Sequence, residues 1–175
     1  MYNMIMVKID QIIAFPTETV FGIGAPLDQP KAIKKIFKIK NRPKNKPLQI
    51  LIAAIEQAQQ LGKFSKKDLA FAKKKWPGPY TLVVYKTRKV PKLVTGGGNK
   101  VGLRMPDHEV ALELIKKYGP LVATSANRSG EKPALTAEEV KKCLPEIEII
   151  IPGTTKHGKA SQVIDLTQGH KVLRY

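Results

Sequence analysis

Short apolar runs alternate with amphipathic segments along most of the chain, and this alternation constrains the fold more than any other feature. Runs of about 4–8 apolar or β-branched residues between turn residues are typical of strands, whereas apolar residues at helical spacing are typical of helices that pack on a core. Interspersed helices and strands favour one twisted, mixed β-sheet flanked by helices, an α+β fold of the α/β type. The expected strands are 11–15, 48–52, 81–87, 101–106, a run that starts near 119, 146–151, 162–166 and 171–175. The expected helices start near residues 31, 55, 65, 109 and 136.

The length of 175 residues suffices for one domain with a sizeable core, and we expect a single domain over residues 1–175. The last two strands should form a hairpin around Gln168 and Gly169. Three helices carry N-cap signals, which fix where those helices should begin. These signals are Ser65 with Asp68, Asp107, and Thr136 with Glu139.

The net charge of +17, from 31 Lys and Arg residues against 14 Asp and Glu residues, is the most unusual property of the composition. Such an excess is typical of proteins that meet a polyanion, such as a nucleotide, a nucleic acid or an anionic membrane. A Lys-rich proteome would give the same composition, so both explanations stay open. No apolar run approaches the roughly 20 residues that span a bilayer, so we expect no membrane partner.

Cysteine and histidine usage argues against disulfides and metal sites. Cys143 is the only cysteine, so no internal disulfide can form, which fits a reducing compartment. The start of the chain has neither a cationic lead nor a long apolar core, so we expect no signal peptide and a cytoplasmic protein. His108, His157 and His170 lack the spacing of metal ligands, and we expect no metal bound by the protein itself.

A basic segment covers residues 31–48 and contains eight cations and no acidic residue. Its first part has apolar residues at helical spacing, and the helix should end before Pro43, because proline disfavours a helix at its own position and just before it. Lys40, Arg42 and Lys46 therefore lie at a helix end and in the loop before a core strand. Arginine offers a planar fork and lysine a compact charge, so we expect these three residues to bind phosphates.

Polar side chains follow several expected strands, where α/β sheets usually place ligand sites. Thr17, Glu18 and Thr19 follow the first strand, and either a ligand or a helix N-cap at Thr17 would explain them. Arg104 lies among apolar neighbours at a strand end, so it should pair with a protein carboxylate or an anionic ligand. The three glycines at 96–98 would suit a phosphate cradle, a mobile lid or a flexible turn alike.

The segment with Ser125, Asn127 and Ser129 offers hydroxyls and an amide just beyond a strand end. Such small side chains suit phosphate oxygens or a metal-bound water. They equally suit a turn that bonds to itself, and the sequence leaves both alternatives open.

Four motifs together carry a family resemblance: PTETVFGIGA from Pro16, KNRPKNKPL from Lys40, WPGPYTLV with VGLRMP in the middle, and SANRSG from Ser125. In this order and at these separations, the chain resembles the YrdC family of threonylcarbamoyl-AMP synthases from about Ile12 to Arg174. The resemblance implies a twisted sheet around a large, basic, concave cavity. The family's KxR…SxN signature appears as Lys40, Arg42, Ser125 and Asn127.

The resemblance also implies an activity. L-Threonine, bicarbonate or CO2 and ATP would give threonylcarbamoyl-adenylate and pyrophosphate, in a nucleotidyltransferase reaction. The product would feed a downstream threonylcarbamoyl-transferase complex, which forms N6-threonylcarbamoyladenosine at position 37 of tRNA. Mg2+ would be held through the ATP phosphates and water, because the sequence offers no carboxylate cluster for a protein cage.

Site roles follow from the resemblance by position. The residues that would hold threonine are Thr19, Arg104 and Ser161, with Arg104 on the threonine carboxylate. The residues that would hold ATP are Lys40, Arg42, Lys46, Ser125, Asn127 and Arg174. Of these, the four residues of the KxR…SxN signature would form the catalytic set.

Three departures from the family pattern are visible. The segment before Ile12 is short, and Gln162 stands where the family often has a threonine after the serine of the late loop. The chain also ends one residue after Arg174, which resembles the short, single-domain members of the family.

The implied chemistry depends on positioning and on charge neutralisation, because the threonine amine attacks CO2 and the carbamate then attacks the α-phosphorus. Two other functions fit part of the sequence. A non-catalytic protein that binds tRNA or double-stranded RNA with the same basic cavity would explain the charge, but not Arg104. A carbamoyl-transferring enzyme of the hydrogenase-maturation type would share the fold, but such enzymes carry extra domains and zinc-binding cysteines. The lysines at 31–38 and 73–75 are expected to bind RNA weakly through charge alone.

Overall fold

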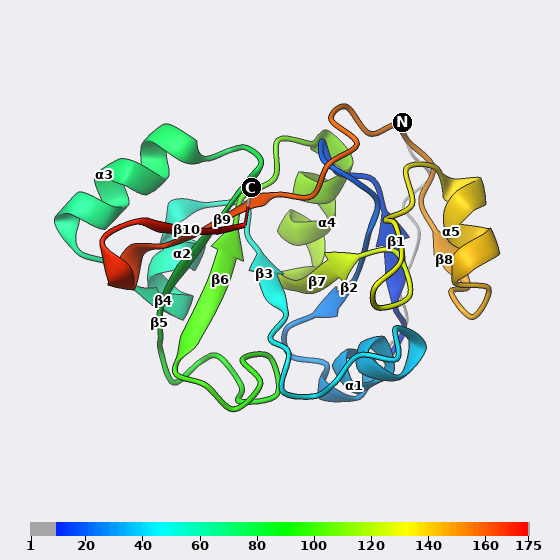
Figure 1. The fold of residues 1–175 in the computed structure, drawn as a ribbon, viewed down its shortest axis with the longest axis horizontal. Helices are drawn as coiled ribbons and strands as arrows, with labels where there is room; N and C mark the ends of the chain where they lie inside the picture. Colours follow the sequence, from blue (N-terminus) through cyan, green and yellow to red (C-terminus); the bar gives the residue numbers. More distant parts are fainter. Residues whose placement is uncertain (1–9, 175) are drawn as a thin grey trace.

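The computed structural model describes residues 10–174, which form one mixed sheet of ten strands with five α-helices around it (Figure 1). The strands are β1 (Ile13–Phe15), β2 (Gly22–Pro26), β3 (Gln49–Leu51), β4 (Gly62–Lys63), β5 (Tyr80–Lys86), β6 (Lys100–Arg104), β7 (Leu121–Ser125), β8 (Ile149–Ile150), β9 (Gln162–Asp165) and β10 (Lys171–Arg174). The helices are α1 (Pro30–Ile39), α2 (Ile55–Leu61), α3 (Lys66–Lys75), α4 (Glu109–Tyr118) and α5 (Ala137–Cys143), and a 3-10 turn covers Leu166–Gln168. The strand order is β10-β9-β5-β6-β3-β7-β2-β1-β8, with β4 paired to β5. The expected fold class is confirmed.

The centre of the sheet mixes both strand directions, since β3 pairs in parallel with β6 and antiparallel with β7. This register places Val83, Gly102, Gln49 and Ala123 side by side in one row across four strands. A Cβ atom at Gly102 would lie 2.9 Å from Cγ2 of Thr81, so any larger residue would displace that side chain. The row forms the floor of the cavity described below.

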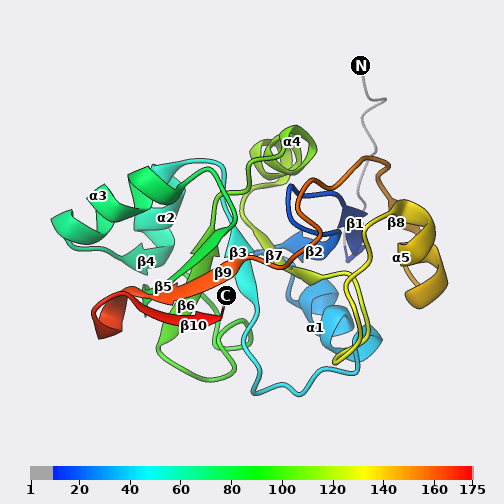
Figure 2. The same ribbon diagram turned by 45° about the horizontal axis from the view of Figure 1, so that its top comes forward.

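Helices cover both faces of the sheet, and Figure 2 shows α1 and α4 on opposite sides of it. Helix α1 buries Ile33, Ile36 and Phe37 in the larger apolar cluster, as their spacing predicts, and it ends at Ile39 ahead of the proline. Helix α4 packs its apolar face on a second, smaller cluster around β1 and β7. The packing of α1 on the larger cluster fixes the end of this helix close to the sheet.

Two of the three predicted helix caps are confirmed. Ser65 and Asp68 form a complete capping box at α3, and Thr136 accepts a hydrogen bond from the third residue of α5. The prediction for Asp107 is wrong, because the N-cap of α4 is His108, which makes no side-chain cap bond. The backbone stays extended at His108, with φ −149°, so the helix begins one position too late for Asp107 to cap it.

Two strands were not predicted from the sequence, and other strands are shorter than predicted. Strand β2 has the sequence GIGAP, whose glycine and proline content gives low β-propensity, yet it pairs with both β1 and β7. The two-residue strand β4 was also missed, and the run 146–151 forms only the short edge strand β8. The N-terminal segment in which no signal peptide was expected lies outside the described residues, and so does the last residue of the expected final strand. Within residues 10–174, no helix is long and apolar enough to cross a membrane.

Candidate active site

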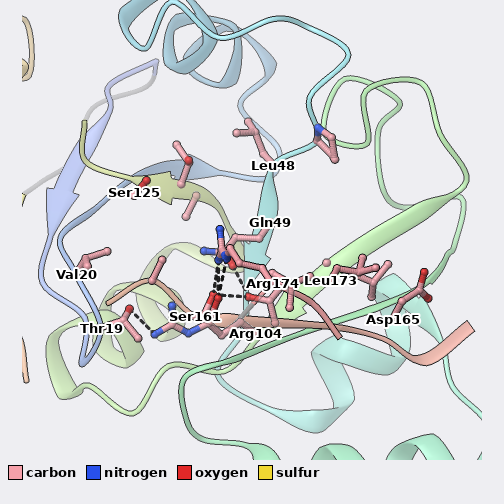
Figure 3. Close-up of a pocket in the computed structure, with 18 of the residues that line it drawn as sticks. Thr19, Val20, Leu48, Gln49, Arg104, Ser125, Ser161, Asp165, Leu173 and Arg174 are labelled. Carbon is pink, nitrogen blue, oxygen red and sulfur yellow. Dashed lines mark hydrogen bonds between the residues drawn. The ribbon is translucent and has the colours of Figure 1, made fainter. Parts of the chain in front are cut away.

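A cavity of about 450 Å3 lies over the central row of the sheet (Figure 3). Its walls come from strands β3, β5, β6, β7, β9 and β10 and from the segments around Thr19 and Arg42. Four cations and one carboxylate line it, so it is basic, as expected. Its polar lining side chains are Thr19, Arg42, Gln49, Thr81, Lys100, Arg104, Thr124, Ser125, Ser161, Asp165 and Arg174.

Arg104 is buried at the end of β6, and its guanidinium contacts three groups of the protein. Nη2 donates to Thr19 Oγ1 at 2.9 Å and lies 2.8 Å from Glu18 Oε1, while Nε donates to the Gly78 carbonyl at 3.3 Å. Burial lowers the pKa of Arg104, and the opposite charge of Glu18 counters this shift. Arginine stays protonated in such surroundings, so Arg104 is a fixed cation whose protein partner is Glu18.

A relay of hydroxyls orients Thr19. Thr17 Oγ1 donates its one proton to the Val20 carbonyl at 2.7 Å, so Thr19 must donate the 2.8 Å bond between the two threonine hydroxyls. Thr19 Oγ1 then remains an acceptor for Arg104. Because β2 rather than a helix follows this turn, the N-cap explanation for Thr17 is wrong.

Ser161 lies on the same side of the cavity as Arg104 and bonds to Arg174 of β10, the last strand. Arg174 donates to the Ser161 carbonyl from Nε at 3.0 Å and from Nη2 at 2.6 Å, and Nη2 also reaches Ser161 Oγ at 3.2 Å. Thr81 donates to Gln49 at 2.7 Å, so Ser161 donates the 2.8 Å bond to Thr81. Figure 3 shows this network next to Arg104. The structure thus brings together all three residues predicted to hold threonine.

Lys40 is 1% exposed and does not line the cavity. Its Nζ donates to the carbonyls of Ser125 and Asn127, both at 2.6 Å, and to Asn127 Oδ1 at 3.0 Å. These three oxygens use all the protons of the ammonium group. Lys40 therefore joins the end of α1 to the loop after β7, rather than facing the cavity.

Asn127 is likewise committed to the loop. Its Nδ2 donates to the carbonyls of Arg128 and Glu131 at 2.8 and 2.7 Å, and its Oδ1 accepts from Ser125 Oγ at 2.6 Å. Of the Ser125–Asn127 pair, Ser125 lines the cavity and Asn127 supports it from behind. The loop is thus a turn that bonds to itself and that also presents one hydroxyl to the cavity.

Arg42 lines the cavity, whereas the exposed side chain of Lys46 lies outside its walls. Arg42 Nη2 donates to the Pro47 carbonyl at 2.7 Å, and Nε donates to the Lys46 carbonyl at 3.3 Å. Burial lowers the pKa of Arg42, and the nearby charge of Arg174 lowers it further. Two guanidinium groups close to each other on the wall make this part of the cavity attractive to anions.

The three glycines at 96–98 do not line the cavity. Gly96 has φ +61°, and a Cβ there would lie 2.4 Å from the Asn45 carbonyl oxygen. The segment is therefore a turn that packs against the basic loop after α1, which is the simplest of the three alternatives.

Sequence reasoning missed several polar residues of the cavity. Lys100 Nζ and Asp165 Oδ2 form an ion pair at 2.9 Å, and Thr81 and Gln49 complete the network around Ser161. The available signal was a polar residue that interrupts a largely apolar strand, as at Thr81 and Asp165. Among the described residues, no group of three or more His, Cys, Asp or Glu side chains could hold a metal ion.

The sheet topology and the cavity define the YrdC-like class of proteins. The crystal structure of E. coli YciO has the same fold, with a TM-score of 0.81 at 23% identity, and the match covers 94% of this chain and 82% of YciO. The Sua5/YciO/YrdC family model, described as telomere recombination, matches residues 6–175. The chain therefore belongs to this family, as its motifs indicated.

Relatives with established names are similar over most of this chain. The threonylcarbamoyl-AMP synthase of Pyrococcus abyssi is 45% identical over 167 residues, which cover 93% of this chain and 49% of the relative. The enzyme of the same name from Vibrio campbellii is 34% identical, and the match covers 89% of this chain and 87% of the relative. The crystal structure of P. abyssi Sua5 complexed with L-threonine superposes with a TM-score of 0.87, over 90% of this chain and 48% of Sua5. The chain thus spans about half the length of the P. abyssi protein.

The buried ammonium of Lys40 should make the stability of the protein depend on pH. Burial lowers its pKa from 10.5 to about 8, with Arg42 adding to the shift. The unfolded chain therefore binds more protons than the folded protein between these values, so stability should rise with pH in this range. From pH 7.5 to 9.5 we expect the free energy of unfolding to rise by about 2 kcal/mol more in the wild type than in Lys40→Met. Urea unfolding at several pH values measures this difference, and parallel curves for the two proteins would contradict it.

Proposed function

We propose that this chain condenses L-threonine, bicarbonate or CO2 and ATP into threonylcarbamoyl-adenylate and pyrophosphate, as a nucleotidyltransferase. The observation that carries the proposal is a cavity with two distinct ends on one sheet. Arg104 and Thr19 meet at one end and Arg42 lies at the other, while Arg174 lies between them, where it bonds to Ser161 and its charge acts on both arginines. The names of the relatives support the same activity.

The Arg104 end suits an α-amino acid of the size of threonine. A carboxylate would bind the guanidinium of Arg104, and the hydroxyls of Thr19 and Ser161 offer partners for the polar groups of the substrate. Because Arg104 is held by the protein in advance, little ordering remains to be done on binding. The ammonium group of threonine would first lose a proton to solvent, and the free amine would then attack CO2 and release a second proton as the carbamate forms. No nucleophilic side chain is required.

The triphosphate of ATP would lie along Arg42, Arg174 and Ser125, where positive charge stabilises the reaction at the α-phosphorus. Lys40 and Asn127 would act by holding Ser125 and its loop in place. Lys46, on the outer side of the loop, would meet only the distal phosphates. The described residues offer no carboxylate cage for a metal. Mg2+ would therefore enter as part of a Mg–ATP complex held by phosphates and water, where it would offset phosphate charge.

The partners of the reaction follow from its product. The adenylate would pass to a threonylcarbamoyl-transferase complex that modifies tRNA. A purely RNA-binding function is the second candidate, favoured by the net charge of +17. It leaves the buried Arg104 and its hydroxyl partners without a role, so we give it second place.

Incubation with ATP, bicarbonate and labelled threonine tests the proposed activity directly. We expect threonine-dependent release of pyrophosphate together with labelled threonylcarbamoyl-adenylate. RNA binding without adenylate formation would support the second candidate in its place.

Arg42→Ala should lower the rate of adenylate formation at least tenfold. The variant removes a charge-assisted contact to phosphate, and such contacts contribute about 1.5–3 kcal/mol each. Pyrophosphate release measures the loss, and thermal unfolding checks that the protein is folded. Arg88→Ala is the matched control, because Arg88 is exposed and lies outside the cavity lining. A folded Arg42→Ala protein with wild-type turnover would disprove the assignment.

The amino acid site should require a carboxylate and discriminate weakly against serine. Serine lacks only the methyl group, which is worth about 1–3 kcal/mol in an apolar pocket, so it should be a poor substrate. Threonine amide cannot form the ion pair with Arg104 and should fail to bind. Competition against labelled threonine measures both ligands, and threonine amide that binds as tightly as threonine would exclude this role for Arg104.

The excess lysines should bind RNA weakly outside the cavity. The exposed lysines of α1 and α3 are the main candidates, and binding there would release counterions from the RNA. The affinity for tRNA should therefore fall steeply with salt and change little when ATP is added. Titrations at low and moderate salt, with and without ATP, measure both effects. No binding at low salt would leave these lysines as a solvated surface.

A further inference from the structure

The three arginines of the cavity are attached to the protein in the same way. In each of them, Nε and Nη2 donate to backbone carbonyls or hydroxyls, whereas Nη1 makes no hydrogen bond within residues 10–174. These arginines are Arg42, Arg104 and Arg174. An Nη1 group carries two N–H bonds, so this group is what each fixed side chain offers to a ligand.

Arg174 lies between the other two arginines. Burial lowers its pKa, and the charge of Arg104 lowers it further. The pKa of Arg42 is lowered first by burial and then by the charge of Arg174, so Arg174 is close to both ends of the cavity. Its guanidinium is fixed on Ser161 by bonds of 3.0 and 2.6 Å to the carbonyl and 3.2 Å to the hydroxyl (Figure 3). No carboxylate of the described residues lies within ion-pair distance of Arg174, so its charge is available to a ligand.

The proposed reaction creates negative charge in this middle part of the cavity. Threonine arrives with one ammonium and one carboxylate group and has no net charge. When its amine attacks CO2, an N–C bond forms, two protons pass to solvent in all, and the product carries a carboxylate and a carbamate. Arg104 already lies 2.8 Å from Glu18 and would hold the threonine carboxylate, so it cannot offset the new charge as well. A second cation must therefore stabilise the carbamate.

We propose that Arg174 is a catalytic residue that binds the carbamate through its free Nη1 group and holds it against the α-phosphate of ATP. A carbamate oxygen then attacks the α-phosphorus, the bond from phosphorus to the bridging oxygen breaks, and pyrophosphate leaves. Two anionic groups must approach each other in this step, and a fixed cation between them offsets their repulsion. The fourth cation of the cavity is less suited, because Lys100 is paired with Asp165 at 2.9 Å. This role rests on the proposed function for the identity of the substrates.

A stable analogue of the carbamate tests this role without turnover. In 2-(1-hydroxyethyl)butanedioate of matching configuration, a CH2 group replaces the carbamate nitrogen, so both carboxylates and the hydroxyl remain and CO2 cannot be lost. Calorimetric titration without ATP should show that the wild type binds this diacid at least as tightly as threonine. In Arg174→Gln, the dissociation constant of the diacid should rise at least about tenfold more than that of threonine, because only the diacid loses a charge-assisted contact. The ratio of the two constants separates this role from a structural one, since a loosened Ser161 would weaken both ligands alike.

Arg88→Gln is the matched control, because Arg88 is exposed, lies outside the cavity lining and loses the same charge. It should keep the wild-type ratio. If Arg174→Gln does not fold, the wild type alone decides, since a diacid bound more than about tenfold more weakly than threonine overturns the role of Arg174. Pyrophosphate release by the wild type separates the two proposals. A wild type that forms no adenylate overturns the proposed function, whereas an active wild type and an unchanged ratio in Arg174→Gln overturn only the role of Arg174.

Discussion

The buried ammonium of Lys40 holds the Arg42 end of the cavity in shape. It joins the end of α1 to two carbonyls and one amide oxygen of the loop after β7. These bonds hold the helix, the loop and the sheet in fixed positions relative to one another. Burying a charge is costly, but three oxygen acceptors offset much of that cost. Two consequences follow for the site: Ser125 is fixed at the wall, and Arg42, two residues after Lys40, takes up the position that faces the cavity.

The KxR…SxN signature therefore contains two kinds of residue. Arg42 and Ser125 line the cavity, whereas Lys40 and Asn127 make the joint that positions them. The opposite end is built by another buried charge, since Glu18 supports Arg104 from behind. In both places a buried ionic or polar group holds the cavity-lining side chain in front of it. Less conformational entropy is therefore lost when a substrate binds.

Features with local causes could be predicted from the sequence. The alternation of strands and helices indicated the fold class, and the spacing of Ser65 and Asp68 indicated a capping box. Strand β2 was missed because its glycines and proline mask a pairing that depends on distant strands. The contact of Lys40 with Ser125 and Asn127 spans more than 80 residues, and a sequence shows a charge without the direction of its side chain. For the same reason, the burial of Arg104 predicted a carboxylate partner but not its identity.

A crystal structure of the protein with threonine and a non-hydrolysable ATP analogue tests the two-ended cavity most directly. We expect the threonine carboxylate on Arg104 and the triphosphate along Arg42 and Arg174. The ammonium of Lys40 should still bond to the carbonyls of Ser125 and Asn127. Phosphate oxygens bound by Arg104, or by a Lys40 that has left the loop, would contradict this assignment of the site.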